Sequence, residues 1–147
     1  EWEGGLYLQG GVVVMPAVNL WACLIEGGKK SKRGVKIKSG TNIEEDFCLL
    51  NYKGPKIKVS AGNGDLPRRD LDQFFGAHNY LTIVKVNRMA TPRTRPIFHD
   101  WSLIFTTYFD NTVLEADEIL LVAQDAGRLV GLGDWRPRMG RFEATLI

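Results

Sequence analysis

Hydrophobic and polar positions along the first thirty residues predict a hairpin followed by a helix. Two β-rich runs, residues 6–9 and 12–15, flank Gly10-Gly11, and a Gly-Gly pair between such runs is typical of a tight turn. Pro16 then ends the second strand and suits the first turn of a helix. Apolar residues follow at i, i+3, i+4 and i+7: Val18, Trp21, Ala22 and Ile25. We therefore expect a helix from about residue 17 to residue 30.

The pattern in the second half of the chain predicts further strands. Residues 80–88 are typical of a strand, whereas Pro92 and Pro96 argue against regular pairing of residues 89–96. Residues 101–109 alternate between apolar and polar side chains, which predicts one strand over the whole range. Its apolar face is expected to pack on the helices as core: Trp101, Leu103, Phe105 and Phe109.

A second helix is predicted next, followed by a glycine-rich loop and a last strand. Thr112-Val113-Leu114-Glu115 fits a capping box at the helix start. The apolar stripe of this helix comprises Ile119, Val122, Ala123, Ala126 and Val130. We expect the helix to end at Gly131, and residues 141–147 to form the strand that closes the chain.

The order of these elements favours one α+β fold. Strand, helix, insertion, strand, strand, helix and strand together predict a ferredoxin-like (RRM-like) βαββαβ sandwich, with both helices on one face of the sheet. The 147 residues fit a single domain, 1–147. Residues 31–79 are weakly patterned and rich in turn formers, so they are predicted to be an inserted lobe after the first helix.

Composition narrows the functional classes. Hydrophobic residues make up 44% and charged residues 24% of the chain, as in an ordinary globular protein. No apolar run approaches the roughly 20 residues that a membrane span needs, and no signal peptide is recognised, so a cytoplasmic protein without membrane contact is expected. Two cysteines and two histidines without ligand spacing give no metal site. We expect no cofactor.

Basic residues gather in three clusters although the net charge is only +2. The clusters hold thirteen of the nineteen lysines and arginines, and such patchiness bears on partner choice more than net charge does. The first comprises Lys29, Lys30, Lys32, Arg33, Lys36 and Lys38, the second Lys85, Arg88, Arg93 and Arg95, and the third Arg136, Arg138 and Arg141.

The third cluster lies in the glycine-rich loop, where we expect function. Gly131, Gly133 and Gly140 permit positive φ and close backbone approach, while Trp135 offers a stacking face. Arginines there would contact phosphate, and the first cluster would act as a second clamp. The predicted nucleic-acid-binding residues are Lys29, Lys30, Lys32, Arg33, Lys36, Arg88, Arg93, Arg95, Gly131, Gly133, Trp135, Arg136, Arg138, Gly140 and Arg141.

Two stretches resemble the RAMP superfamily of CRISPR-associated proteins. Residues 15–24, which contain the proline-led helix start, and residues 130–142, which contain the glycine-rich loop, are similar to that superfamily's first helix and loop. Trp135 and Pro137 depart from its usual loop. The resemblance implies a ferredoxin-like module that binds RNA or another single strand, and some members polymerise along a guide RNA.

A second resemblance covers more of the chain and implies no function. Residues 93–98, 101–103 and 131–137 are similar to small proteins carried by bacteriophages and prophages. The location implied is the cytoplasm of a bacterial host. The partners we expect are single-stranded RNA or DNA, with RNA favoured, and further copies of the chain in a homo-oligomer or filament.

Two other functions remain open at this point. A structural phage protein, or one that binds a host protein, would use exposed aromatic anchors, for which the candidates are Trp2, Trp21, Phe98 and Trp135. A metal-independent ribonuclease would need a general base, which His99 beside Asp100, or His78, could supply. We expect no catalytic residues, because a lone histidine near a turn is more often structural.

Overall fold

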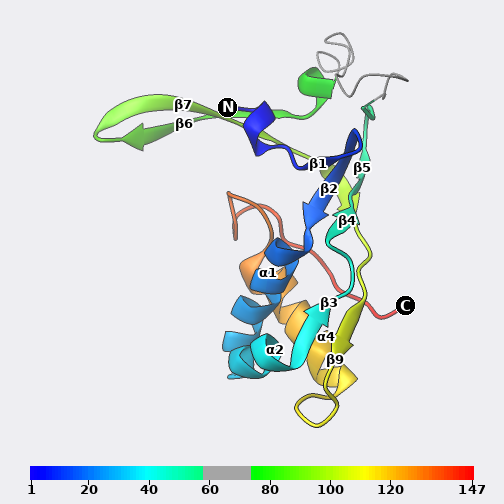
Figure 1. The fold of residues 1–147 in the computed structure, drawn as a ribbon. Coiled ribbons are helices and arrows are strands. Elements are labelled where there is room, and N and C mark those ends of the chain that lie inside the picture. The colour runs from blue at the N-terminus through cyan, green and yellow to red at the C-terminus, as the bar shows by residue number, and fades with distance from the viewer. Residues whose placement is uncertain (58–73) are drawn as a thin grey trace. The chain divides into compact units, whose positions relative to one another are not determined.

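A computed structural model describes residues 1–57 and 74–147 and shows a mixed α+β protein with several small antiparallel sheets (Figure 1). The chain forms two compact units. Unit 1 comprises Glu1–Met15 and Leu49–Ile104, and unit 2 comprises Pro16–Cys48 and Phe105–Ile147. Each unit is therefore built from two separate stretches of sequence, and each is described below by itself.

The N-terminal hairpin of unit 1 is confirmed. After a short 3-10 helix, η1 (Glu3–Gly5), strands β1 (Leu8–Gln9) and β2 (Val12–Pro16) pair antiparallel, with Leu8 opposite Val13. Gly10 and Gly11 form the turn with φ of 59° and 77°, a conformation that glycine adopts without steric cost. The chain passes from unit 2 into unit 1 in strand β4 (Phe47–Leu49), of which only Leu49 belongs to unit 1.

Unit 1 contains two further ladders among its described residues. β5 (Asn51–Lys53) pairs with β8 (His99–Ser102) across a register shift. β6 (Asn79–Val86) pairs with β7 (Met89–Pro96) along its full length, through a two-residue turn in which Asn87 and Arg88 have φ of 49° and 67°. The predicted strand 80–88 is confirmed apart from its last two residues.

The prediction that prolines prevent pairing of residues 89–96 was wrong. In a two-residue hairpin the residues beside the turn, Val86 and Met89, exchange hydrogen bonds, and bonded pairs then alternate with unbonded ones. Counting from this pair puts Pro92 and Pro96 in unbonded pairs, where the backbone nitrogen points away from the partner strand. Their missing N–H groups therefore cost the β6–β7 ladder nothing.

Aromatic side chains form the core of unit 1. Trp2, Tyr52 and Phe74 are buried with Val13 and Leu50. Rings of Trp2 and Phe74 meet edge to face, as do those of Tyr52 and Phe74. Each such contact adds about 0.5–1.5 kcal/mol to the burial of apolar area. Partly buried side chains surround this cluster: Leu6, Ile57, Phe98, Trp101 and Leu103.

His78 is the polar centre of this core. Its ring packs against the rings of Tyr52, Phe74 and Phe98, and its nitrogens lie 3.1 Å from two carbonyl oxygens, Nδ1 from Ile97 and Nε2 from Pro55. Its own carbonyl accepts the indole N–H of Trp2 at 3.0 Å and the backbone N–H of Ile97 at 3.0 Å. One residue thus ties several separate segments of unit 1 together.

Unit 2 is mainly helical. α1 (Ala17–Lys29) is followed by α2 (Gly34–Gly40) and by β3 (Thr41–Ile43), which pairs antiparallel with β9 (Thr107–Phe109). α4 (Ala116–Asp125) continues into a π-helical turn, η2 (Ala126–Val130). Both predicted helices are confirmed, including the end of the second at Gly131. The buried apolar side chains of this unit include Leu20, Leu24, Ile37, Leu114, Val122 and Ala126.

The capping box of the second helix lies three residues later than predicted. Glu115 is the N-cap and pairs reciprocally with Glu118, whose side chain accepts the backbone N–H of Glu115 at 2.9 Å. Thr112 instead belongs to the preceding turn, where its backbone N–H and its hydroxyl both donate to the Asp110 carboxylate. Because Asp110 satisfies Thr112, the helix begins only after Leu114, which is buried.

The predicted strand 101–109 is interrupted. β8 ends at Ser102 and β9 begins at Thr107, and the two strands belong to different units. Side chains still alternate across the break, so Leu103 and Phe105 are half-buried while Ile104 and Thr106 are exposed. Phe109 is exposed rather than core, and Trp101 packs on the aromatic cluster of unit 1 instead of on helices.

Residues 141–147 do not form the predicted strand. Near its start the segment contacts η2, where the backbone N–H of Phe142 donates to the Gly127 carbonyl at 3.1 Å. A Cβ at Gly127 would overlap the Phe142 carbonyl, so the absence of a side chain at 127 allows this contact. The N–H of Phe142 is therefore hydrogen-bonded to a helical turn and not to a neighbouring strand.

The predicted lobe, residues 31–79, is shared between the units. Residues up to Cys48 belong to unit 2 and those from Leu49 onward to unit 1, while residues 58–73 lie outside the described part of the chain. The lobe, the single domain and the ferredoxin-like arrangement stay predictions. Within the described ranges, no helix combines the length and apolar character that crossing a bilayer requires.

Candidate nucleic-acid interface

The glycine-rich loop of unit 2 is closed by its own backbone. Gly131, Gly133 and Gly140 have φ of 76°, 94° and 78°, which confirms the predicted positive φ at all three. The backbone N–H of Leu132 donates to the Gly140 carbonyl at 2.9 Å, joining the two ends of the loop. Within it, the N–H of Met139 donates to the Trp135 carbonyl at 2.9 Å. The loop is therefore a defined structure with a narrow base.

α1 anchors the base of this loop. The Cys23 thiol donates to the Gly131 carbonyl at 3.2 Å, and this contact is buried. Burial raises the pKa of Cys23 to about 11, against a smaller opposing effect of the Arg136 charge. The thiol is thus protonated at neutral pH and can act as a donor. An apparently isolated cysteine, for which the sequence indicated no role, fixes the candidate site to the helix.

The three arginines of the loop are all exposed. Arg136 Nη1 donates to the Gly133 carbonyl at 2.9 Å, and Arg141 Nε donates to the Pro137 carbonyl at 2.7 Å. A guanidinium has five N–H donors, so each of these bonds leaves donors that can reach a phosphate. Trp135, on the same loop, is half-buried. Charge and a stacking face are therefore combined on one short loop.

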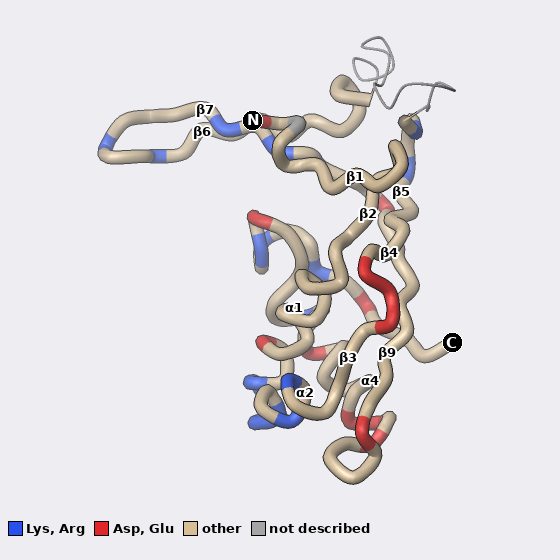
Figure 2. Tube along the Cα trace, viewed as in Figure 1, with Lys and Arg blue, Asp and Glu red and all other residues tan. Residues whose placement is uncertain are grey.

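The first basic cluster lies at the C-terminal end of α1 and along α2, apart from the loop arginines (Figure 2). Two of its members have acidic partners: Lys29 with Glu26 at 2.5 Å, and Arg33 with Glu118 at 3.2 Å. The hydrogen bond from the backbone N–H of Glu115 lowers the pKa of Glu118 most, and the hydrogen bond from Arg33 lowers it further. Lys30, Lys32 and Lys36 are exposed.

Residues of both basic groups in unit 2 lower the pKa of Glu26. The Lys29 ammonium lowers its pKa most, and the charges of Lys30 and Arg136 lower it further. Glu26 follows Cys23 by three residues on α1 and so lies on the same face of the helix. The Glu26 carboxylate therefore interacts with charges of both basic groups.

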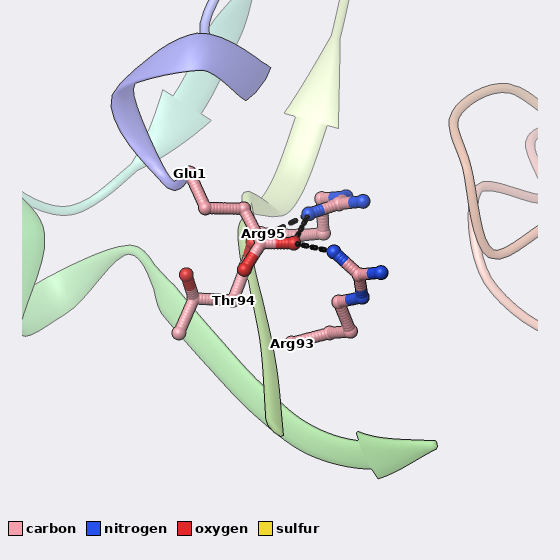
Figure 3. A network of polar contacts seen from close by, with 4 residues as sticks. All are labelled: Glu1, Arg93, Thr94 and Arg95. Atoms are coloured by element: carbon pink, nitrogen blue, oxygen red, sulfur yellow. Dashed lines mark hydrogen bonds and ion pairs between the residues drawn. The ribbon is translucent and has the colours of Figure 1, made fainter. Parts of the chain in front are cut away.

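The second basic cluster belongs to unit 1, and two of its arginines bind Glu1 (Figure 3). Arg95 Nη1 and Arg93 Nη1 lie 2.6 Å and 3.0 Å from Glu1 Oε1. The Arg95 bond, followed by those of Arg93 and of the Thr94 backbone, lowers the pKa of Glu1 to about 2. Arg88 is exposed at the tip of the β6–β7 hairpin. The predicted residues thus form separate groups in two units.

Acid is expected to weaken the Glu1 cluster. An unfolded glutamate titrates near pH ~4.3, above the pKa of about 2 in the fold, so the stabilising effect is present above ~4.3 and is lost as the pH falls toward 2. The gap in melting temperature between the native chain and Glu1→Gln should therefore narrow from pH 6 to pH 2. Glu143→Gln, at an exposed carboxylate of unit 2, is the control. A gap that stays constant with pH would contradict the assignment.

The acidic partners are the residues that sequence reasoning missed. Glu26 is three residues from Lys29, so helix spacing could have revealed that pair. Glu118 and Glu1 are far from their arginines in the sequence, and only the fold brings them together. Charge clusters that are continuous along the chain are therefore partly neutralised in the structure.

The aromatic anchors and histidines proposed for the other functions are mostly structural. Trp2 is buried and Phe98 packs in the core of unit 1, so neither forms an exposed anchor. Trp21 is half-buried and donates its indole N–H to the Thr41 hydroxyl at 3.3 Å. His78 is buried between carbonyl groups and cannot reach a substrate. His99 is exposed. The carboxylate oxygen Oδ2 of its neighbour Asp100 lies 3.8 Å from Lys53 Nζ.

Comparison with family models, with curated proteins and with solved structures found no match for this chain. Across the described residues, no group of three or more His, Cys, Asp or Glu side chains is placed to hold a metal ion. Cys23 and Cys48 are free and buried.

Proposed function

We propose that the chain binds single-stranded nucleic acid, with RNA favoured, through residues 131–141 of a ferredoxin-like module. The observation that carries the proposal is the closed glycine loop, which holds Arg136, Arg138 and Arg141 exposed around the half-buried Trp135. Arginine suits phosphate because its planar donors match phosphate oxygens. An aromatic face adds about 1–3 kcal/mol per stacked base. The preference for RNA rests on the resemblance of the loop to RAMP proteins.

Backbone contacts of this kind predict little sequence preference. The loop offers charge and a stacking face, and these recognise the phosphate chain and any base rather than one base edge. The first basic cluster supports binding beyond the loop, because Lys30, Lys32 and Lys36 are exposed on the same unit. The Glu26 carboxylate, which interacts with charges of both groups, would repel a phosphate chain that contacted them together. We therefore infer that the loop is the main contact and the cluster an auxiliary one.

Charge reversal in the loop tests this function. Fluorescence anisotropy of labelled single-stranded RNA and DNA across a salt series should show steep salt dependence for the native chain. Each phosphate contact contributes ~0.7 to the slope of log affinity against log salt on a single strand. Arg136→Glu/Arg138→Glu should lower that slope by ~1.4, in proportion to two lost contacts, and weaken binding at least tenfold.

A control variant changes the net charge by the same amount, but its two substitutions lie in unit 1. Lys53→Glu/Lys85→Glu reverses two exposed lysines of unit 1, neither of which belongs to the loop, and should leave the slope nearly unchanged. Equal losses for the two double variants would mean that overall charge, and not the loop, drives binding. A native chain that binds neither RNA nor DNA at low salt would contradict the proposal as a whole.

A further inference from the structure

The β6–β7 hairpin has two edges of different character. Within the described residues these strands pair only with each other, so each has one edge that faces no other strand (Figure 1). Because hydrogen-bonded pairs alternate from Val86 and Met89 at the turn, every second residue directs its backbone groups outward. Two contacts support this assignment: the N–H of Ile97 points inward to His78, and that of Thr94 points outward to Glu1.

The outward edge of β7 cannot accept another strand. Its outward positions are Ala90, Pro92, Thr94 and Pro96. The two prolines have no N–H to offer, and the Thr94 N–H is taken by the Glu1 carboxylate. η1 also covers the base of this edge, since a Cβ at Gly5 would lie 2.8 Å from Pro96 Cδ. Prolines and covering segments are common means of protecting an edge strand.

Within residues 1–57 and 74–147, no strand pairs with the outward edge of β6. Its outward positions are Asn79, Leu81, Ile83 and Lys85, and each has an N–H and a carbonyl. The side chains of Leu81 and Ile83 are 60% and 71% exposed. An exposed apolar edge without proline is a template for strand addition. The β6 edge of the hairpin can therefore pair with another strand, whereas the β7 edge cannot.

We propose that β6 pairs antiparallel with β6 of a second copy, forming a closed dimer through a four-stranded sheet. Two identical antiparallel strands are related by a twofold axis, so the surface is self-complementary. The register that pairs every outward residue has Thr82 on the axis. It sets Leu81 against Ile83 of the second copy, which continues the exposed apolar strip across the interface.

Charge and edge chemistry favour a second copy and a closed assembly. In the same register Lys85 faces Asn79 of the second copy, so the two Lys85 side chains of the dimer do not lie opposite each other. Because the β7 edge is protected, the sheet cannot continue past the dimer into an open fibre. This interface lies on unit 1 and is independent of the loop proposed to bind nucleic acid.

Mass measurements test the edge. Light scattering of the native chain at micromolar concentrations should give about twice the chain mass of 16.5 kDa. Ile83→Pro removes an outward N–H from β6 and should give the monomer mass. Ala90→Pro makes the same change on the protected edge and should leave the dimer intact. A monomeric native chain, or a dimer that survives Ile83→Pro, would overturn the proposal.

Disulfide trapping tests the register without relying on a proline variant. Residues on the axis form an unbonded pair with Cα atoms about 4.5 Å apart, within the range of about 4.4–6.8 Å that a disulfide spans. Thr82→Cys should therefore link two copies under mild oxidation, and reductant should separate them. Val84→Cys, on the same face but opposite Tyr80, should not link. Background is low because Cys23 and Cys48 are buried. Equal linking by both variants would refute the register.

Discussion

Gly140→Ala is expected to destabilise unit 2 by roughly 3–4 kcal/mol, the range for a steric clash added to backbone strain, and to abolish nucleic-acid binding. A Cβ at Gly140 would overlap the Leu132 carbonyl oxygen, and the residue has φ of 78°. The hydrogen bond from Leu132 to Gly140 would break, and the base of the loop would open. Urea unfolding followed by fluorescence measures the stability, and anisotropy measures the binding.

Gly133→Ala is the matched control for this result. Gly133 also has positive φ, but an added Cβ would have no heavy atom within 4 Å. Only the backbone strain remains, about 1–2 kcal/mol, so binding should persist. If both alanine variants lost binding equally, conformational freedom of the loop rather than its closed base would be the property that matters.

His78→Phe is expected to destabilise unit 1 by roughly 2–4 kcal/mol, although the ring size is nearly kept, because a buried carbonyl without a donor costs about 1–3 kcal/mol. The Ile97 and Pro55 carbonyls both face ring nitrogens of His78. A neutral imidazole donates to one of them and a charged one to both. Phenylalanine donates to neither, so at least one carbonyl loses its hydrogen bond.

His78→Gln separates hydrogen bonding from packing at this position. Its amide can donate to one carbonyl but loses the ring contacts with Tyr52, Phe74 and Phe98. Stability should then rank native above Gln and Gln above Phe if hydrogen bonds dominate. Amide exchange at Ile97, whose N–H binds the His78 carbonyl, reports the same region directly. A Phe variant as stable as the native chain would show that neither carbonyl depends on the ring.

Local features of the fold could be predicted because their causes lie in adjacent residues. Gly10-Gly11 and the turn they form, Pro16 before α1, and positive φ at Gly131, Gly133 and Gly140 are all found as expected. Glycine permits positive φ and proline fixes φ, so both residues indicate backbone geometry at their own positions.

Features that depend on distant residues could not be predicted. The alternation over residues 101–109 continues through the break between β8 and β9, so periodicity gives no sign that the chain leaves one unit for the other. Pairing of β7 depended on which way the nitrogens of Pro92 and Pro96 point, and this follows only from the register.

The candidate site shows the same limit. The glycines of its loop and their positive φ were predicted, but the acidic partner of Arg33 is 85 positions away in the sequence, and that of Arg93 is 92 positions away. A run of basic residues therefore overstated the positive surface, because the compensating carboxylates come from other elements. The link from Cys23 to the loop spans 108 positions and was equally inaccessible.

The division of each unit into two stretches has a consequence for synthesis on the ribosome. All segments of unit 1 exist once residue 104 has been made, whereas residues 16–48 of unit 2 must wait for residues 105–147. Until then the apolar side chains of α1 and α2, such as Leu20, Leu24 and Ile37, lack the α4 half of their core. The nascent chain thus carries this uncovered hydrophobic surface while residues 49–104 of unit 1 are made, a period in which chaperones can bind it.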